Sequence, residues 1–219
     1  MPDPETSPDA KRRVSQIALP LEGAGAHRPA RIVVGNANEA VIDALRSPER
    51  WPYHTAVLTG PPRSAKSLIG RWVASQGIEV IDDADREPEA QLFHVWNARQ
   101  PGGTQPGAPL LIIANAPGWQ VQLPDLRSRI GGSLQLELGE PDDAMAAQLI
   151  EEIASQRGLS LGAGAADYLI PRARRSHREL EQLVLMIDRI SLERQTPATM
   201  SVWRGALEAL QGPEQQSLL

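Results

Sequence analysis

The sequence predicts an α/β fold in which a parallel β-sheet is followed by a purely helical unit. Short apolar runs alternate with segments of helical periodicity up to about residue 138, and only helical segments follow. Strands that alternate with helices form parallel sheets with right-handed crossovers. The 219 residues are enough for one medium domain with a small appendage.

The first predicted helix spans residues 37–45, where apolar residues recur at helical spacing and Pro48 closes the segment. The first strand of the sheet, 55–59, is a β-branched run that ends at a Gly-Pro-Pro turn. The helix expected at 67–76 is stopped by Gly77. A strand, a turn and a helix therefore follow one another here.

The second strand covers residues 78–82 and ends in carboxylates, and a helix is expected at 91–98. A loop rich in Gly and Pro leads into the third strand at 110–114. Its five apolar residues stand between turn signals, as expected for a strand buried on both faces. Residues 133–138 alternate polar and apolar side chains and are the fourth predicted strand.

The composition changes at residues 139–141, Gly-Glu-Pro, and four helices are expected after it. This tail of about 75 residues is small for an independent domain but would serve as a lid on the sheet. The predicted helices of the lid are 142–157, 163–172, 176–195 and 199–211. The predicted organisation is an arm at 1–28, an α/β part at 29–140, a lid at 141–212 and a tail at 213–219.

Residues 60–67, Gly-Pro-Pro-Arg-Ser-Ala-Lys-Ser, indicate a phosphate-binding loop between a strand and a helix. Lys66 would reach the terminal phosphates, and Ser67 would offer its hydroxyl to Mg²⁺. The second glycine of the usual pattern is Ala65, which has poor access to positive φ, so the loop is expected to be strained or slightly altered. A plain strand-to-helix turn is the alternative. The residues expected to line the phosphates are Gly60, Pro61, Ser64 and Ala65.

Polar side chains end two of the predicted strands. Asp82 would hold Mg²⁺ through water, and Asp83 would polarise the attacking water. Asp83 is one methylene shorter than the glutamate common in strong ATPases, so weak or no intrinsic ATPase activity is expected. Asn115 follows the third strand and would sense a γ-phosphate. The alternative is that all three are ordinary turn residues.

Two arginines are candidates for contact with phosphates. Arg129 precedes the last strand, where an arginine can point out of the subunit and act on a neighbour's phosphates as an arginine finger. Arg178 begins the long lid helix and would reach back to the nucleotide, in competition with Arg172, Arg174 and Arg175. Solvated surface arginines are the alternative for both.

Residues 16–21, Gln-Ile-Ala-Leu-Pro-Leu, form an apolar peptide inside a polar, proline-rich segment. The surrounding arm, 1–28, is expected to be disordered, so this hexapeptide is suited to a groove on another protein. The alternative is that it forms the first strand of the fold. The residues expected to contact the partner are Gln16, Ile17, Leu19, Pro20 and Leu21.

The composition excludes several functional classes. A net charge of −5 argues against sequence-independent binding of nucleic acid, which requires a basic face. Without cysteine, disulfides and thiolate metal sites are excluded, and a reducing cytosol fits. No apolar run approaches 18 residues, so a cytoplasmic protein without a membrane segment is expected.

From about Arg31 to Leu210, the chain resembles the AAA+ module of the replication initiator DnaA, and more closely the Hda family of short DnaA homologues. The Leu-Pro-Asp-Leu-x-Ser-Arg string at 123–129 is fairly specific to this group, whereas the phosphate loop is not. The chain ends near the lid, with no room for the initiator's helix-turn-helix. The other segments that carry the resemblance are the phosphate loop, Val33-Val34-Gly35-Asn36, Ile81-Asp82-Asp83, Leu92-Phe93-His94-Val95-Trp96-Asn97 and Arg178-Glu179-Leu180-Glu181.

The resemblance implies an AAA+ P-loop NTPase core that binds ADP or ATP with Mg²⁺. By position, Ser67 and Asp82 would hold the Mg²⁺, while Val34 and Gly35 join the residues near the nucleotide. The family usually inserts a strand and a helix between Ser67 and the next strand, and this chain has no room for them. The expected sheet therefore has the family order 5-1-4-3, with edge strand 2 missing.

The resemblance also implies two protein partners. The hexapeptide looks like the motif by which Hda binds the DNA polymerase sliding clamp. The ADP-bound, clamp-bound protein would dock on ATP-loaded DnaA and trigger hydrolysis there, with Arg129 as the finger in trans. The chain would then be a negative regulator of replication initiation. It would be cytoplasmic, associated with the nucleoid through the clamp, and able to form a homo-oligomer. Direct sequence-specific binding of DNA is not expected.

Two other functions remain open at this point. The first is a DNA-associated AAA+ ATPase or helicase loader that hydrolyses ATP itself. The second is a pseudo-ATPase adaptor that no longer binds nucleotide, because Arg63 and Ala65 stand where AAA+ proteins usually carry glycine.

Overall fold

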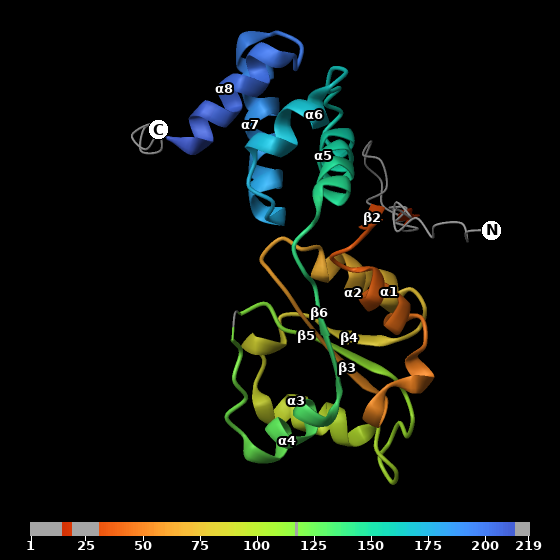
Figure 1. Ribbon diagram of the computed structural model, residues 1–219. Helices are drawn as coiled ribbons and strands as arrows, with labels where there is room; N and C mark the ends of the chain where they lie inside the picture. Colours follow the sequence, from red (N-terminus) through yellow and green to blue (C-terminus); the bar gives the residue numbers. More distant parts are fainter. Residues whose placement is uncertain (1–14, 19–30, 117, 213–219) are drawn as a thin grey trace, which may run out of the picture.

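A four-stranded parallel sheet lies at the centre of the computed structural model, which describes residues 15–18, 31–116 and 118–212 (Figure 1). The sheet order is β4-β5-β3-β6, and all three pairings are parallel. Read from β6, this is the family order 5-1-4-3, so the predicted topology is confirmed. β4 is a short edge strand, which limits pairing with other chains. The strands are β3 (Thr55–Thr59), β4 (Glu79–Ile81), β5 (Leu110–Ile113) and β6 (Leu134–Glu137).

Helices cover both faces of this sheet and complete the α/β base. Leu58 and Ile113 face the cluster that includes α1 and α2, whereas Val57 and Ile112 face α3 and α4. Neighbouring residues of a strand point to opposite faces, so the continuous apolar run of β5 is buried on both sides, as predicted. The helices of the base are α1 (Glu39–Leu45), α2 (Lys66–Ala74), α3 (Glu89–Ala98) and α4 (Pro124–Gly132), with 3₁₀ turns at Pro48–Arg50, Pro52–His54 and Ala84–Arg86.

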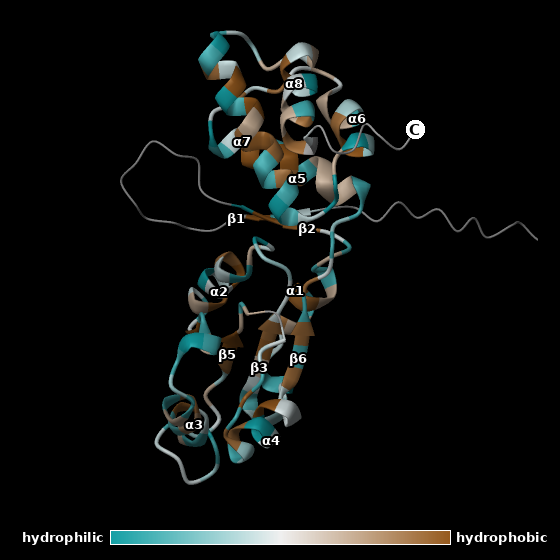
Figure 2. Ribbon diagram, turned by 90° about the vertical axis from the view of Figure 1, so that its left-hand side faces the viewer, coloured by the Kyte–Doolittle hydropathy of each residue, from teal (hydrophilic) through white to brown (hydrophobic). Residues whose placement is uncertain are grey.

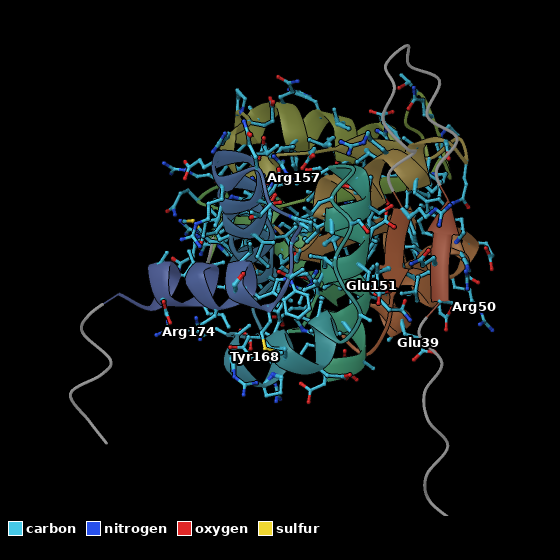
Figure 3. All side chains as sticks on the ribbon, turned by 90° about the horizontal axis from the view of Figure 1, so that it is seen from above. Glu39, Arg50, Glu151, Arg157, Tyr168 and Arg174 are labelled. Carbon is cyan, nitrogen blue, oxygen red and sulfur yellow. The ribbon has the colours of Figure 1, made fainter. Side chains whose placement is uncertain are left out.

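Four helices form a layer above the base, called the lid below (Figure 1). Their apolar faces turn toward one another and enclose a core separate from that of the base (Figure 2). Arg157, seen from above in Figure 3, ties α5 to α7 through its ion pair with Asp188, with 2.7 Å from Nε to Oδ2. None of the described helices has the length and apolar character needed to cross a membrane. The lid helices are α5 (Asp143–Gln156), α6 (Ala165–Leu169), α7 (His177–Arg194) and α8 (Met200–Gln211), with a 3₁₀ turn at Ile170–Arg172.

The structure departs from the sequence prediction near the amino terminus. β1 (Ser15–Ala18) pairs antiparallel with β2 (Arg31–Val34) and places Ile17 opposite Ile32. The prediction of a disordered arm over 1–28 is therefore wrong for residues 15–18. Leu19, Pro20 and Leu21, with the remainder of the arm, lie outside the described residues.

Two physical gains account for β1. Its pairing satisfies backbone hydrogen bonds along one edge of β2, and the half-buried Ile17 packs against the base core. Gln16 remains exposed, and its Oε1 accepts a hydrogen bond from Arg31 Nη1 at 3.3 Å. Only the first half of the hexapeptide is therefore seen to contribute to the protein's own fold.

The segment around β2 joins the base to the lid. The Arg31 N–H donates to Glu152 Oε1 of α5 at 3.3 Å. A Cβ added at Gly35 would lie 3.0 Å from the Cβ of Met145, so α5 approaches this turn closely. This close packing sets where the lid stands relative to the phosphate loop.

Candidate functional site

The phosphate loop connects β3 to α2 in a tightly constrained backbone. Gly60 has a φ of +152°, and a Cβ there would lie 2.7 Å from the Leu138 Cβ, so only glycine fits. Arg63 and Ala65 have φ values of +66° and +65°, which are left-handed conformations for residues that carry a side chain. Each costs roughly 1–2 kcal/mol. The strain expected at Ala65 is present, and Arg63 adds to it.

Lys66 turns back onto its own loop. Its Nζ donates to the carbonyl oxygens of Gly60 and Pro61, each at 2.9 Å, and the residue is only 5% exposed. Burial lowers the pKa of this amine, while the negative charges of Asp82, Asp85 and Asp83 partly oppose that effect. The ammonium group therefore lies between the loop and a set of carboxylates, where a phosphate would meet it.

The polar residues at the strand ends meet as predicted from their positions. Asn115 Nδ2 donates to Asp83 Oδ1 at 2.7 Å and to Asp82 Oδ1 at 3.2 Å. The Asn115 N–H donates to Asp85 Oδ1 at 2.6 Å, so a third carboxylate, which the sequence analysis did not single out, joins the group. Asp83 has a φ of +54° and also lies 3.9 Å from Arg86. One residue, Asn115, thus holds three carboxylates together through its side-chain amide and its backbone N–H.

An open cavity beside the loop, the outer cavity, has a volume of about 660 Å³. No group of three or more His, Cys, Asp or Glu side chains in the described part of the chain forms a ready-made metal site. Mg²⁺ in phosphate sites commonly takes one or two carboxylates together with phosphate oxygens. Of the two residues predicted to hold it, Ser67 lines this cavity, whereas Asp82 does not but accepts a hydrogen bond from Asn115, which does. The predicted site residues that line the outer cavity are Ser64, Ala65, Lys66, Ser67, Asp83 and Asn115.

A second, smaller cavity of about 140 Å³, the inner cavity, lies between β2, the loop and the lid. Apolar walls with a few polar groups are typical of a pocket for a flat organic ring. The prediction named Val34, but its side chain belongs to the base core, and Val33 lines the cavity instead. Asn38 is buried at the wall of this cavity, and its Oδ1 accepts a hydrogen bond from the Gly35 N–H at 2.9 Å, which holds the turn at Gly35. The apolar residues of the wall are Ile32, Val33, Leu68, Met145, Leu149 and Ile153.

An ion pair crosses from the loop to the lid. Arg63 Nε lies 2.6 Å from Glu181 Oε2 of α7, and both residues line both cavities. The Arg63 side chain is 63% exposed, so solvent screens the pair and its contribution to stability is small. The position of this ion pair matters more than its energy, because the pair lies between the two cavities, where a ligand that occupied both would pass.

The first turn of α7 faces the loop through a different residue from the one predicted. Arg178 is exposed, lines neither cavity, and makes no side-chain hydrogen bond or ion pair with the described residues. His177, immediately before it, is 6% exposed and lines the inner cavity. A signal was available in the sequence, since His177 continues the buried helical stripe formed by Leu180, Val184 and Ile187.

Arg129 lies on α4, toward the end of the base remote from the lid (Figure 1). Its guanidinium carbon lies 4.9 Å from the centre of the Phe93 ring and 4.6 Å from that of Trp96, which are cation–π distances. Among the described residues it has no ion-pair partner, and the side chain is half-buried. The structure therefore keeps Arg129 away from the phosphate loop of its own chain.

Comparisons with solved structures show the fold. Domain III of the Thermotoga maritima replication initiation protein DnaA superposes with a TM-score of 0.59 at 13% identity, covering 82% of this chain and 95% of that one. The T. maritima RuvB Holliday junction branch migration motor gives 0.55 at 17% identity, covering 78% and 69%. A structure described as a DNA replication initiation factor gives 0.56 at 17% identity, covering 74% and 65%. At these identities, the likeness establishes the fold alone.

The helical part of the chain supplies the more specific finding, because residues 143–204 match the family model of the Hda lid domain. This part of the chain is therefore similar to the lid of Hda proteins. The match covers α5, α6, α7 and the beginning of α8, including His177 and Glu181, the residues of α7 that line the inner cavity. A comparison with curated protein sequences finds no match.

Proposed function

We propose that this protein is a negative regulator of replication initiation that binds ADP, is tethered to the sliding clamp and promotes ATP hydrolysis by DnaA. The observation that carries the proposal is the helical unit matching the Hda lid, which stands against a phosphate-binding loop. The organisation into an α/β nucleotide-binding part at 29–140 and a lid at 141–212 belongs to this proposal.

The two cavities support nucleotide binding. The apolar walls of the inner cavity suit the adenine ring, and Ser64 and Ala65 of the loop line both cavities, so a nucleotide there can place its phosphates beside the loop. The outer cavity brings the Lys66 amine close to the acidic residues. Bound Mg²⁺ would neutralise phosphate charge, with the Ser67 hydroxyl and the Asp82 carboxylate holding it. Asp83 is already bonded by Asn115, so a residue that could orient a water is engaged within the chain. This arrangement favours nucleotide binding with little turnover.

Arg129 is the residue proposed to act in trans. Its guanidinium makes cation–π contacts with the Phe93 and Trp96 rings and forms no ion pair with a carboxylate among the described residues. A guanidinium with that environment keeps its donors for an anion outside the chain, and an arginine supplied to a neighbour's triphosphate stabilises the charge of the transition state. The anion proposed here is the ATP bound to DnaA.

The hexapeptide is proposed to tether the protein to the clamp. Gln16 is exposed, but Gln16 and Ile17 also pair with β2. Pairing with β2 occupies one edge of β1, so a partner could pair with the other edge, whereas a groove that encloses the whole peptide would require β1 to leave β2. Tethering raises the local concentration of the regulator near replicating DNA.

The test is a reconstitution with DnaA carrying labelled ATP, clamp loaded on DNA, ADP and this protein. The expected result is conversion of DnaA-bound ATP to ADP that requires both this protein and the clamp. Hydrolysis that proceeds at the rate of DnaA alone would overturn the proposal. Calorimetry with ADP is run on the same preparation.

One observation favours a second candidate, an adaptor that does not bind nucleotide. The Lys66 amine is bonded to two carbonyls of its own loop, and Arg63 closes the loop against Glu181. If these contacts persist, no phosphate reaches the lysine. Absence of heat and of a thermal shift with ADP would select this candidate.

A further inference from the structure

His177 stands out as a buried polar group without a function in the fold. It is the first residue of α7, it is 6% exposed, and its Nδ1 is buried with no hydrogen-bond partner. An unpaired buried polar atom costs roughly 1–3 kcal/mol. A leucine would continue the stripe of Leu180 and Val184 without that cost, so packing alone does not explain the histidine.

The imidazole faces the same space as the phosphate loop. Ser64, Ala65 and His177 line the inner cavity together. Burial and, to a smaller extent, the positive charge of Lys66 lower the pKa of His177 to about 4. The imidazole on the lid therefore lies within the field of the ammonium group on the base.

The other charged side chains around this cavity are already engaged. Arg63 and Glu181 pair with each other. Glu152 Oε1 accepts hydrogen bonds from the Arg31 N–H and from Gln156 Nε2. The Arg31 guanidinium donates to Gln16. None of these groups, and no aspartate near Lys66, is bonded to the imidazole in the described part of the chain.

The end of α7 adds a favourable potential for an anion. Ser176 caps the helix by accepting from the Glu179 N–H at 3.2 Å, so the helix begins at His177 and its amino terminus adjoins the loop. Helix amino termini carry partial positive charge and attract phosphate groups. The unpaired imidazole and the amino terminus of α7 thus lie beside Ser64 and Ala65 of the loop, a position that suits a phosphate oxygen.

We propose that His177 is the hydrogen-bond donor by which the lid holds the phosphates of the nucleotide in the loop, in place of the predicted Arg178. This inference rests on the proposed nucleotide binding. His177 would join the lid to the base only when a phosphate lies between them, which couples the position of the lid to the presence of nucleotide.

The proton linkage has a definite sign. In the ligand-free protein, the neutral imidazole is favoured, because its pKa is about 4 whereas an unfolded histidine titrates near 6.5. A phosphate beside it favours the charged form and raises that pKa. ADP binding near pH 6 should therefore take up protons through His177, and this contribution should disappear above pH 8.

The experiment is calorimetric titration of the full chain with ADP and with adenosine, at pH 6 and pH 8 in buffers of different ionisation enthalpy. His177→Leu should weaken ADP binding about tenfold, leave adenosine binding within twofold and remove the excess proton uptake at pH 6. The same variant should melt at the wild-type temperature or above it, because it loses an unpaired buried polar atom. His177→Asn, which keeps a donor, should recover most of the affinity without the proton uptake.

His94→Leu is the matched control, since His94 is an exposed histidine on α3 at the remote end of the base. It should match the wild type in affinity and proton uptake. Unchanged ADP binding by His177→Leu would overturn the inference while leaving the proposed function intact. Equal losses for ADP and adenosine, with a lower melting temperature, would show a structural role and also overturn it. Absence of ADP binding by the wild type would overturn both.

Discussion

The loop end of the base and its α3–α4 end each present a positively charged side chain, but the surroundings of the two charges differ. Lys66 is bonded to two carbonyls of its own loop and lies near three carboxylates. Among the described residues, Arg129 contacts the rings of Phe93 and Trp96 and has no ion-pair partner. The charge at the loop end is thus enclosed by groups of its own chain, whereas the charge at the other end is not paired with a carboxylate in the described part of the chain.

Lid contacts separate the two ends further, whereas positive φ values occur at both, since Tyr53, beside Trp96 of α3, has a φ of +54°. Positive φ values at Arg63 and Ala65, the pair with Glu181 and the buried His177 all belong to the loop end. α4 contains no residue with positive φ, and the lid does not cover it. Nucleotide binding and action on a partner should therefore respond to different substitutions.

Arg129→Ala should have the largest effect. Stimulation of DnaA-bound ATP hydrolysis should fall about 10³-fold, because the guanidinium in trans is lost, while ADP affinity should stay unchanged. Hydrolysis in the reconstituted system and calorimetry measure the two quantities. The control is Arg127→Ala, in which Arg127, on the same helix, already donates from Nε to the Val121 carbonyl at 2.7 Å. A loss of ADP affinity in Arg129→Ala would contradict the separation of the two ends.

Lys66→Ala should show the reverse pattern. ADP binding should weaken roughly 100-fold, because the charge-assisted contacts to phosphate are lost. Calorimetry gives the affinity, and Arg46→Ala, an exposed cation on α1, is the control for net charge. The adaptor candidate predicts that Lys66→Ala does not alter stimulation of DnaA, so a full reconstituted rate in this variant would favour it.

Substitutions in the hexapeptide should change neither nucleotide binding at the loop end nor the action of Arg129 at the α3–α4 end of the base. Replacing Gln16, Leu19 and Leu21 with alanine should weaken clamp binding at least about tenfold, while ADP affinity and the melting temperature change little, since the Gln16 side chain is exposed. Ile17→Ala should instead lower stability by about 1 kcal/mol, because Ile17 packs on the base core. A clamp pull-down measures the loss of clamp binding, and thermal unfolding measures the loss of stability. A full-strength pull-down with the triple variant would refute the tether.

Relief of strain at the loop should give the smallest effect. Ala65→Gly removes a left-handed conformation that costs roughly 1–2 kcal/mol but makes the unfolded chain more flexible, so a net gain of about 0.5–1 kcal/mol is expected. Ala147→Gly, in the regular helix α5, should instead lose about 1 kcal/mol. Denaturant unfolding measures both, and a loss at Ala65 would show that the loop is not strained there.

Much of the site followed from local patterns. The run before Gly60 and the helix after Lys66 located the loop, and carboxylates at the end of β4 met Asn115 because parallel strands end at the same edge of a sheet. The inner cavity did not follow. Its walls come from β2, the loop and two lid helices, so no short window of sequence contains it.

The sequence by itself determined the alternation of strands and helices, the strand–turn–helix that contains the loop, and the helical lid, because periodicity and turn chemistry act over a few residues. The strand order followed from the family resemblance. The tertiary structure alone decided that Gln16 and Ile17 pair with β2 and that Lys66 bonds its own loop. It also decided that His177, and not Arg178, faces the cavity. Each of these depends on long-range packing, in which the burial of Ile17 or the docking of α7 against the base outweighs the local preference of the residue.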